Sequence, residues 1–292
     1  MKRFSSVHNT LQLFIESVSV EQILQILQSI IQEQHGIALP SNVPLLDYDR
    51  PEFSWIFKSL NFQHWESASD SQILSLYGPP ECNIRHIASY IVNRSSPKTQ
   101  RTILYYFCSS RMRKTPIVSH FVLTFLYQFI RHSPKDKQKA IFKRFLRDLV
   151  QVIHGGEKDY ITESERFKAS TDMWLNKVIG APAGILWAAL MTVLTNEPDR
   201  QLLVIVDGLE NIEDDTGEFI KGIRTFVDRL RQRNLNMKAL LASQPRDHIK
   251  EIFGGLPYIE HDEMRESQAT LCFNNPSHSK ISKEHESSVE WE

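Results

Sequence analysis

Residues 202–211 read LLVIVDGLEN. Five apolar residues, 202–206, lead directly into Asp207 with no polar residue among them. A strand with one solvent-exposed face alternates apolar and polar residues, whereas a strand of a parallel sheet is covered on both faces and is apolar along its length. The segment therefore predicts a buried parallel strand that ends at an acidic side chain.

Four further segments have the character of β-strands and complete the predicted sheet. They are residues 73–77 (ILSLY), 102–107 (TILYYF), 237–242 (MKALLA) and 258–260 (YIE). Apolar residues at three- and four-residue spacing, as in amphipathic helices, lie between several of these segments. Strands that alternate with helices indicate an α/β fold, in which helices flank a parallel sheet.

The sequence also predicts how the chain is divided. Ser19 and Gln22 have the spacing of a capping box, and the apolar residues after them recur with helical spacing, so a helix is expected from Ser19 to near residue 35. We divide the chain into an N-terminal helical segment (1–36), a linker with three prolines (37–51), the α/β domain (52–262) and a polar C-terminal tail (263–292). Within the tail, HESSVEW (285–291) resembles DRPEFSW (49–55), which suggests the start of a truncated second module.

Aromatic residues are expected to serve packing. In the segment FSWIFKSL, one helical face is predicted for Phe53, Ile56, Phe57 and Leu60. The tryptophans assigned to the core or to packing between segments are Trp55, Trp65, Trp174 and Trp187.

Charge and cysteine content narrow the range of partners and compartments. The formal net charge is -1, so no overall field selects nucleic acid or an anionic membrane. Basic residues are concentrated between positions 94 and 147, and we interpret them as a solvated helix face rather than a nucleic-acid groove. The three cysteines are scattered and fit neither a disulfide framework nor a zinc site, and no segment approaches the roughly 20 apolar residues of a membrane span. A cytoplasmic protein without membrane contact is expected.

Three predicted strand ends are candidates for a ligand site, because parallel sheets bind ligands at the carboxyl ends of their strands. These ends are Gly78, Asp207 and Ser243. In a phosphate-binding strand-loop-helix, backbone amides and a helix N-terminus face the phosphates, a lysine reaches them, and a hydroxyl holds magnesium. An aspartate at the end of a second buried strand completes the metal shell.

The order of these segments resembles a known family. The matching segments are FSWIF (53–57), LYGPPECNIRH (76–86), TILYYFCSS (102–110), LLVIVDGLEN (202–211) and LLASQP (240–245). Over roughly residues 45–262 the chain resembles the NACHT-type P-loop NTPases of the STAND class, specifically the fungal nephrocystin-like N-terminal module. The resemblance implies a P-loop NTPase-like parallel sheet and a site for ATP or GTP with Mg²⁺.

The loop departs from the pattern G-x-P-G-S-G-K-S/T of this family. Gly78 and Pro80 match it, but Glu81 and Asn83 stand for two glycines, Ile84 for the lysine and Arg85 for the magnesium-binding hydroxyl. A glutamate beside a triphosphate is repelled, by about 1 kcal/mol even when solvated. Arg85 or His86 is the candidate substitute cation.

The two other strand ends also differ from the family. Asp207 keeps the metal position and Glu210 an acidic one, whereas Asn211 stands for the acid that polarises water and Gln244 for the arginine of Ser-Arg-Pro. The resemblance thus implies nucleotide-binding positions at Gly78, Pro80, Arg85, His86, Ser243 and Gln244, a metal position at Asp207, and degenerate catalytic positions at Glu210 and Asn211. The alternative is that Asp207 is a turn residue, that Glu210 and Asn211 cap the next helix, and that His86 is a surface residue.

Two functions follow from these departures. The first is a degenerate NTPase module that hydrolyses little or no nucleotide and acts as a scaffold, through a protein partner or self-association. The second is a working ATP or GTP switch in which Arg85 or His86 replaces the lysine and Asp207 holds magnesium. Nucleic acid is not an expected partner of either.

Overall fold

The structure is a computed structural model that describes residues 18–33, 51–70, 72–79, 82–95, 101–108, 117–153, 178–212, 218–233 and 235–260. Its centre is a five-stranded sheet in the order β2-β3-β4-β1-β5, in which every neighbouring pair is parallel. The strands are β1 (Gln72–Tyr77), β2 (Thr102–Phe107), β3 (Leu202–Asp207), β4 (Met237–Ser243) and β5 (Tyr258–Ile259). The α/β class with a parallel, P-loop NTPase-like sheet is confirmed.

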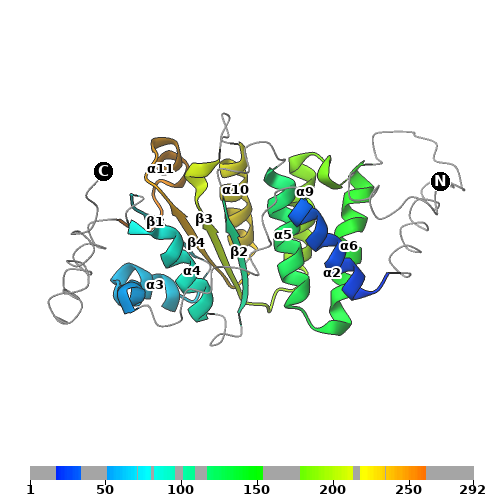
Figure 1. Cartoon of the computed structure of the whole chain (residues 1–292), viewed down its shortest axis with the longest axis horizontal. Helices are drawn as coiled ribbons and strands as arrows, with labels where there is room; N and C mark the ends of the chain where they lie inside the picture. Colours follow the sequence, from blue (N-terminus) through cyan, green and yellow to red (C-terminus); the bar gives the residue numbers. More distant parts are fainter. Residues whose placement is uncertain are drawn as a thin grey trace, which may run out of the picture.

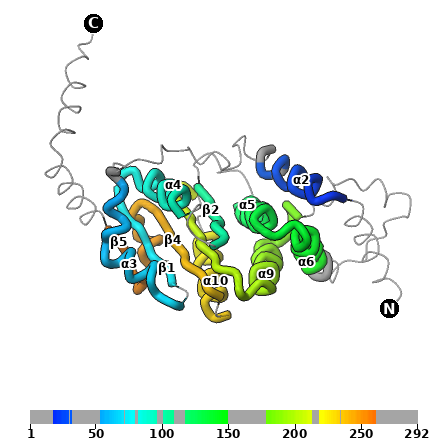
Figure 2. The backbone as a smooth tube through the Cα atoms, turned by 90° about the horizontal axis from the view of Figure 1, so that it is seen from below, coloured from blue at the N-terminus to red at the C-terminus, as the bar shows by residue number. Residues whose placement is uncertain are grey.

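Helices cover both faces of the sheet and extend past β2, as Figure 1 shows. They are α2 (Val20–Glu33), the 3-10 helix η2 (Pro51–Lys58), α3 (Leu60–Ser67), α4 (Ile84–Ser95), α5 (Ile117–Arg131), α6 (Lys135–Ile153), α9 (Ala183–Thr195), the 3-10 turn η5 (Leu209–Asn211), α10 (Glu218–Gln232) and α11 (Asp247–Phe253). Figure 2 shows α5, α6 and α9 beside β2, with α2 lying across α5. No helix within the described residues is long and apolar enough to span a membrane.

Strand β3 is apolar throughout because each of its faces meets a separate hydrophobic cluster. Val204 and Val206 belong to the cluster formed with α5, α9 and α10. Leu203 and Ile205 point to the other side and belong to the cluster formed with η2 and α4. All six residues of β3 are buried, as expected for a central parallel strand.

Helix α2 begins where the capping box predicts. The amide of Ser19 donates to Gln22 Oε1 at 2.8 Å, and the amide of Gln22 donates to Ser19 Oγ at 3.1 Å. The apolar side chains Ile23, Leu27 and Ile31 are buried against α5 and belong to the same cluster as β3. The apolar face of α2 is therefore covered within the chain.

The FSWIF segment differs in part from the prediction. Phe53 and Ile56 are buried in η2, but Leu60 is 70% exposed and does not share their face. The reason is that η2 ends at Lys58 and a new helix, α3, begins at Leu60, so the helical phase is broken at Ser59. The prediction for Leu60 is wrong.

The tryptophans of the described residues pack as expected. Trp55 and Trp65 are buried, and the half-buried Trp187 packs against Phe121 and Phe226 at ring-centroid distances of 5.1 and 5.3 Å. Trp174 lies outside the described residues.

Side-chain amides form hydrogen bonds with the backbone of both edge strands. At β2, the Tyr105 amide donates to Gln128 Oε1 at 2.8 Å and Gln128 Nε2 donates to the Tyr105 carbonyl at 3.0 Å, so Gln128 imitates a neighbouring strand. At β5, Asn61 Nδ2 donates to the Tyr258 carbonyl at 3.0 Å. Unpaired backbone groups on an edge strand can pair with a strand of another chain. Because these contacts occupy such groups, they disfavour association through the sheet edges.

A buried lysine forms hydrogen bonds with the backbone at the amino-terminal end of the sheet. Lys238 on β4 is 1% exposed, and its Nζ donates to the carbonyl oxygens of Ala68 at 2.6 Å and of Asp70 at 3.0 Å, just after α3. Burial lowers the pKa of Lys238, which Asp70 partly offsets. The lysine thus satisfies two carbonyl groups of the segment that follows α3.

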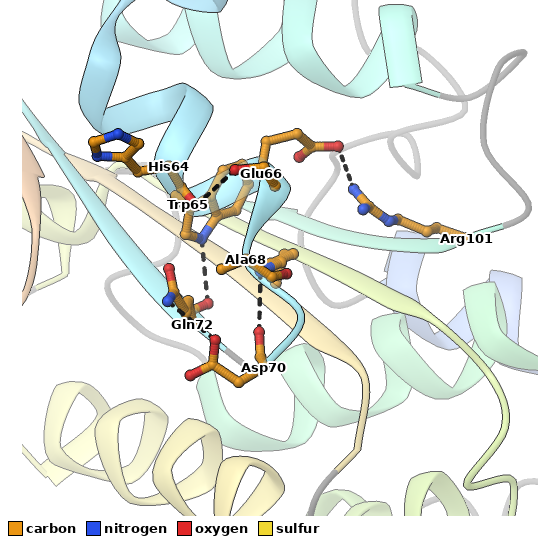
Figure 3. Close-up of polar contacts among 9 residues, drawn as sticks. His64, Trp65, Glu66, Ala68, Asp70, Gln72 and Arg101 are labelled. Carbon is orange, nitrogen blue, oxygen red and sulfur yellow. Dashed lines mark hydrogen bonds and ion pairs between the residues drawn. The ribbon is translucent and has the colours of Figure 1, made fainter.

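Further polar contacts of the same region are drawn in Figure 3. Trp65 Nε1 donates to the Gln72 carbonyl at 3.2 Å, and the partly buried Arg101 pairs with Glu66. These contacts tie α3 to the beginnings of β1 and β2.

Candidate functional site

The three strand ends selected from the sequence lie together at the carboxyl edge of the sheet. Strand β4 lies between β1 and β3, and the register pairs Tyr77 with Ser243 and Asp207 with Ala242. The Gly78 amide donates to the Ser243 carbonyl at 3.4 Å, and the Gly208 amide donates to the Ala242 carbonyl at 3.0 Å. The predicted site is therefore one region of the molecule.

An ion pair between Arg85 and Asp207 occupies the centre of this region. Arg85 Nε lies 2.9 Å from Asp207 Oδ2, and Arg85 Nη2 donates to the carbonyl of Cys108 at the end of β2. The side chain of Asp207 is 4% exposed and that of Arg85 is 48% exposed. A half-exposed guanidinium thus covers a buried carboxylate.

Gly208 allows this close approach. Its φ of 78° lies in the left-handed region, which favours glycine. A Cβ atom there would lie 2.8 Å from the Cys108 carbonyl oxygen and 3.1 Å from Arg85 Nη2. Neither Gly208 nor Cys108 was among the residues selected from the sequence, although a glycine directly after a strand-ending acid was a usable signal.

The loop after β1 is filled by its own apolar side chains. A Cβ at Gly78 would lie 3.1 Å from Ile84 Cδ1 and 3.3 Å from Cys82 Cβ, and both Ile84 and Cys82 are buried. The buried side chain of Ile84 therefore packs directly over Gly78. Pro80 and Glu81 lie outside the described residues.

Asn83 adopts a left-handed backbone conformation before α4. Its φ is 51°, in a region that asparagine tolerates better than most residues. Its carbonyl accepts the amides of His86 at 2.8 Å and Ile87 at 3.1 Å, which starts α4. Asn83 thus forms the turn that leads into the helix.

Glu210 contacts both Asn211 and Gln244. The Gln244 amide donates to Glu210 Oε2 at 3.1 Å, and Asn211 Nδ2 donates to Glu210 Oε1 at 3.2 Å. Ser243 Oγ donates to the Gln244 carbonyl at 2.6 Å. These contacts connect η5 to the end of β4, a structural role that the sequence did not predict for Glu210.

His86 is half-buried and packs on the FSWIF segment. Its ring stacks on Phe53, with the ring centroids 6.5 Å apart and the planes at 13°. Of the two candidate substitute cations, Arg85 is the one that contacts Asp207.

Comparison with models of known protein families identifies the family of the chain. The family model described as "Nephrocystin 3, N-terminal" matches residues 52–244, about two thirds of the chain. The chain belongs to the nephrocystin 3 N-terminal family. The match begins just before FSWIF and ends at Gln244, so it contains every residue of the candidate site. A search of curated proteins found no match.

In this member of the nephrocystin 3 N-terminal family, the candidate metal position does not fit Mg²⁺. Magnesium requires several oxygen ligands in near-octahedral geometry at about 2.0–2.1 Å. Asp207 instead faces a guanidinium at 2.9 Å, and the described residues contain no group of three or more His, Cys, Asp or Glu side chains that would hold a metal. A second cation at this carboxylate would be repelled by Arg85.

In this family member, the pKa of Asp207 shows how far the ion pair with Arg85 offsets the cost of burying the carboxylate. The pKa of Asp207 is raised from 3.8 to about 6, chiefly by burial. The charge of Arg85 and its hydrogen bond act against this rise, and the charge of Glu210 adds to it. Arg85 therefore offsets only part of the cost of burying this carboxylate, and its removal would leave the charge unpaired.

Proposed function

We propose that this chain is a degenerate module of the NACHT type within the STAND class of P-loop NTPases, and that it acts by protein association instead of nucleotide hydrolysis. Its partner is another protein or a second copy of the chain. The observation that carries the proposal is the ion pair between Arg85 and Asp207, because Arg85 takes the place where the family pattern requires a metal ion.

The apolar loop supports the same function. A triphosphate needs positive charge and free backbone amides at the loop. Here Ile84 replaces the lysine and packs over Gly78. At the two other strand ends, Glu210 bonds to Gln244 and Asn211, so its carboxylate oxygens already have protein partners.

The cytoplasm is the compartment that we propose for this module. Cys82 and Cys108 are buried and are not joined in disulfides, as is usual in a reducing environment. Burial also raises the pKa of Cys108 well above its ordinary value, which keeps this thiol unreactive.

Thermal unfolding with and without nucleotide tests the proposal. A ligand at about one hundred times its dissociation constant stabilises the folded state by about 2.7 kcal/mol. We expect no change in the melting temperature with millimolar ATP or GTP and Mg²⁺. The same measurement on Arg85→Ser tests whether the guanidinium group is what excludes Mg²⁺ from Asp207, and its control is Arg101→Ser, which breaks a partly buried ion pair at the opposite end of the sheet.

A nucleotide-dependent stabilisation would support the alternative, an ATP or GTP switch with an atypical loop. In that case Asp207→Ala should abolish the magnesium dependence. Steady hydrolysis by the purified chain, lost in Asp207→Ala, would overturn the proposed function.

A further inference from the structure

We propose that the surface of α5 on which α2 packs binds the α2 helix of a second copy of this chain, so that two copies associate by exchanging α2. The inference rests on the association function proposed above and names its partner. We call this surface, which α2 (Val20–Glu33) occupies within one chain, the α2-binding surface.

The α2-binding surface belongs to the family module, whereas α2 does not. The match to the nephrocystin 3 N-terminal family covers residues 52–244, which include α5 and exclude α2. Every residue of α5 from Ser119 to Ile130 is buried, and Figure 2 shows α2 lying across this helix. Without α2, the module would expose apolar side chains of α5, as surfaces that bind other proteins do.

Other contacts fix α5 in the domain independently of α2. Gln128 binds the backbone of β2 at Tyr105. Phe121 packs on Trp187 of α9 and on Phe219 of α10, with ring centroids 5.1 and 5.6 Å apart. Because these contacts do not involve α2, the α2-binding surface should keep its shape when α2 leaves it.

Apolar side chains attach α2 to this surface. Ile23, Leu27 and Ile31 are spaced four residues apart, which places them on one face of the helix, and each is 1% exposed. All three belong to the same hydrophobic cluster as the apolar residues of α5. Hydrophobic contact is non-directional, so a surface of this kind accepts a helix with apolar residues at the same spacing.

The hydrogen bonds of α2 do not attach it to the rest of the domain. Among the described side chains of residues 18–33, Ser19 and Gln22 bond to each other's amides, and Ser29 Oγ donates to the Ile26 carbonyl at 2.9 Å. These bonds all lie within the helix and its cap. By contrast, side-chain hydrogen bonds tie α3 to β1 and β5. Release of α2 therefore breaks only apolar contacts.

The α2 helix of a second copy fits the surface because it carries the residues that the surface already binds. After exchange, each α2-binding surface again contacts Ile23, Leu27 and Ile31, so the apolar contacts of two separate chains are regained. The cost that remains is the entropy of association. Association by strand pairing is disfavoured, since Gln128 and Asn61 occupy backbone groups of the two edge strands.

Binding of α2 as a separate peptide tests the α2-binding surface. In the release variant of the full-length chain, Ile23→Asp with Leu27→Asp, the helix carries two charges that an apolar surface excludes. A fluorescent peptide with the sequence of residues 18–33 should bind this variant about tenfold or more tightly than the wild type, whose surface is occupied. The peptide with the same two substitutions should bind neither protein. Fluorescence anisotropy measures the affinities, and circular dichroism checks that the release variant is folded.

Sedimentation velocity of the full-length chains tests the exchange. The wild type should form dimers as its concentration rises, and these should return slowly to monomers on dilution, because α2 must first leave its surface. The release variant should dimerise about tenfold or more weakly. The control is Gln25→Asp with Ser29→Asp, which introduces the same charges at the same spacing on the exposed side of α2. It should associate like the wild type.

Leu27→Ala gives a milder test that holds even where the release variant does not fold. The exchanged dimer and the separate chains lose the same buried contact, so the fraction of dimer at equilibrium should stay that of the wild type. The return to monomers on dilution should become about tenfold or more faster. In an ordinary interface through this face of α2, the substitution would weaken the dimer instead.

Four results would overturn the inference: a folded release variant that does not bind the peptide, a release variant that associates like the wild type, a Leu27→Ala chain with a weakened dimer, or a wild type that stays monomeric at every concentration. In the last case, peptide binding to the release variant would identify a helix of another protein as the occupant. Association by another surface would leave the proposed function standing, whereas stabilisation by nucleotide and Mg²⁺ would contradict that function whatever the outcome here.

Discussion

The two ends of the sheet each contain a basic side chain that binds other groups of the protein, but the groups differ. At the amino end, Lys238 is buried and donates to backbone carbonyls of the segment after α3. At the carboxyl end, Arg85 is half-exposed and pairs with the buried carboxylate of Asp207. The lysine binds backbone carbonyl groups, whereas the arginine covers a buried carboxylate.

This difference indicates which end of the sheet should respond to pH. Lys238 is buried away from solvent, so its replacement should affect the stability of the fold alone. Asp207 has a pKa raised to about 6, so the carboxyl end should respond to pH. Substitutions at each end of the sheet test this difference.

The largest effect is expected at the amino end. Lys238→Met keeps much of the volume of the side chain but leaves the carbonyls of Ala68 and Asp70 without their donor. Each buried acceptor without a partner costs about 1–3 kcal/mol, so we expect a loss of about 4 kcal/mol in the free energy of unfolding. Urea denaturation measures it, and a variant as stable as the wild type would show that water replaces the lysine.

The second effect concerns pH at the carboxyl end. Asp207 binds its proton more tightly in the folded chain than in the unfolded chain, where its pKa is about 3.9. Stability therefore decreases as pH rises from about 4 to about 6 and is level above that. We expect Asp207→Asn to gain up to about 3 kcal/mol relative to the wild type across this window.

Urea denaturation of both proteins at several pH values measures this difference. Subtracting the two curves removes the contribution of the other titrating groups, which the proteins share. A difference that does not change with pH would show that Arg85 compensates the burial of Asp207 fully.

The third effect compares two glycines with the same backbone conformation. Gly208 and Gly255 both have φ of 78°, but an added Cβ meets the Cys108 carbonyl oxygen at 2.8 Å in the first and nothing within 4 Å in the second. Gly255→Ala should cost about 1 kcal/mol from the left-handed conformation alone. Gly208→Ala should cost about 2 kcal/mol more, because the contact with Cys108 and Arg85 must open. Equal losses would mean that the carboxyl end is loosely packed.

Much of the fold could be predicted from the sequence because strand and helix signals are local. The run from Leu202 to Val206 is a buried strand, and the capping box at Ser19 begins α2 as expected. The phase of FSWIF could not be predicted, because the break at Ser59 depends on where η2 and α3 each pack. Leu60 is exposed for that reason.

The candidate site was predicted in its position but not in its contacts. Asp207, Gly78 and Ser243 meet because parallel strands end at one edge. The role of Glu210 in binding Gln244 and Asn211 was not predicted, since it depends on the distance between β3 and β4 after folding.

The sequence by itself determined the parallel α/β sheet, the family, and the residues that stand at the three strand ends. Only the tertiary structure decided how these residues meet: Arg85 pairs with Asp207, 122 residues away, and Ile84 packs over Gly78. The physical reason is the separation along the sequence over which each kind of interaction acts. Hydrophobic periodicity is set by neighbours within a few residues, whereas an ion pair depends on how helix α4 and strand β3 are placed by the whole core.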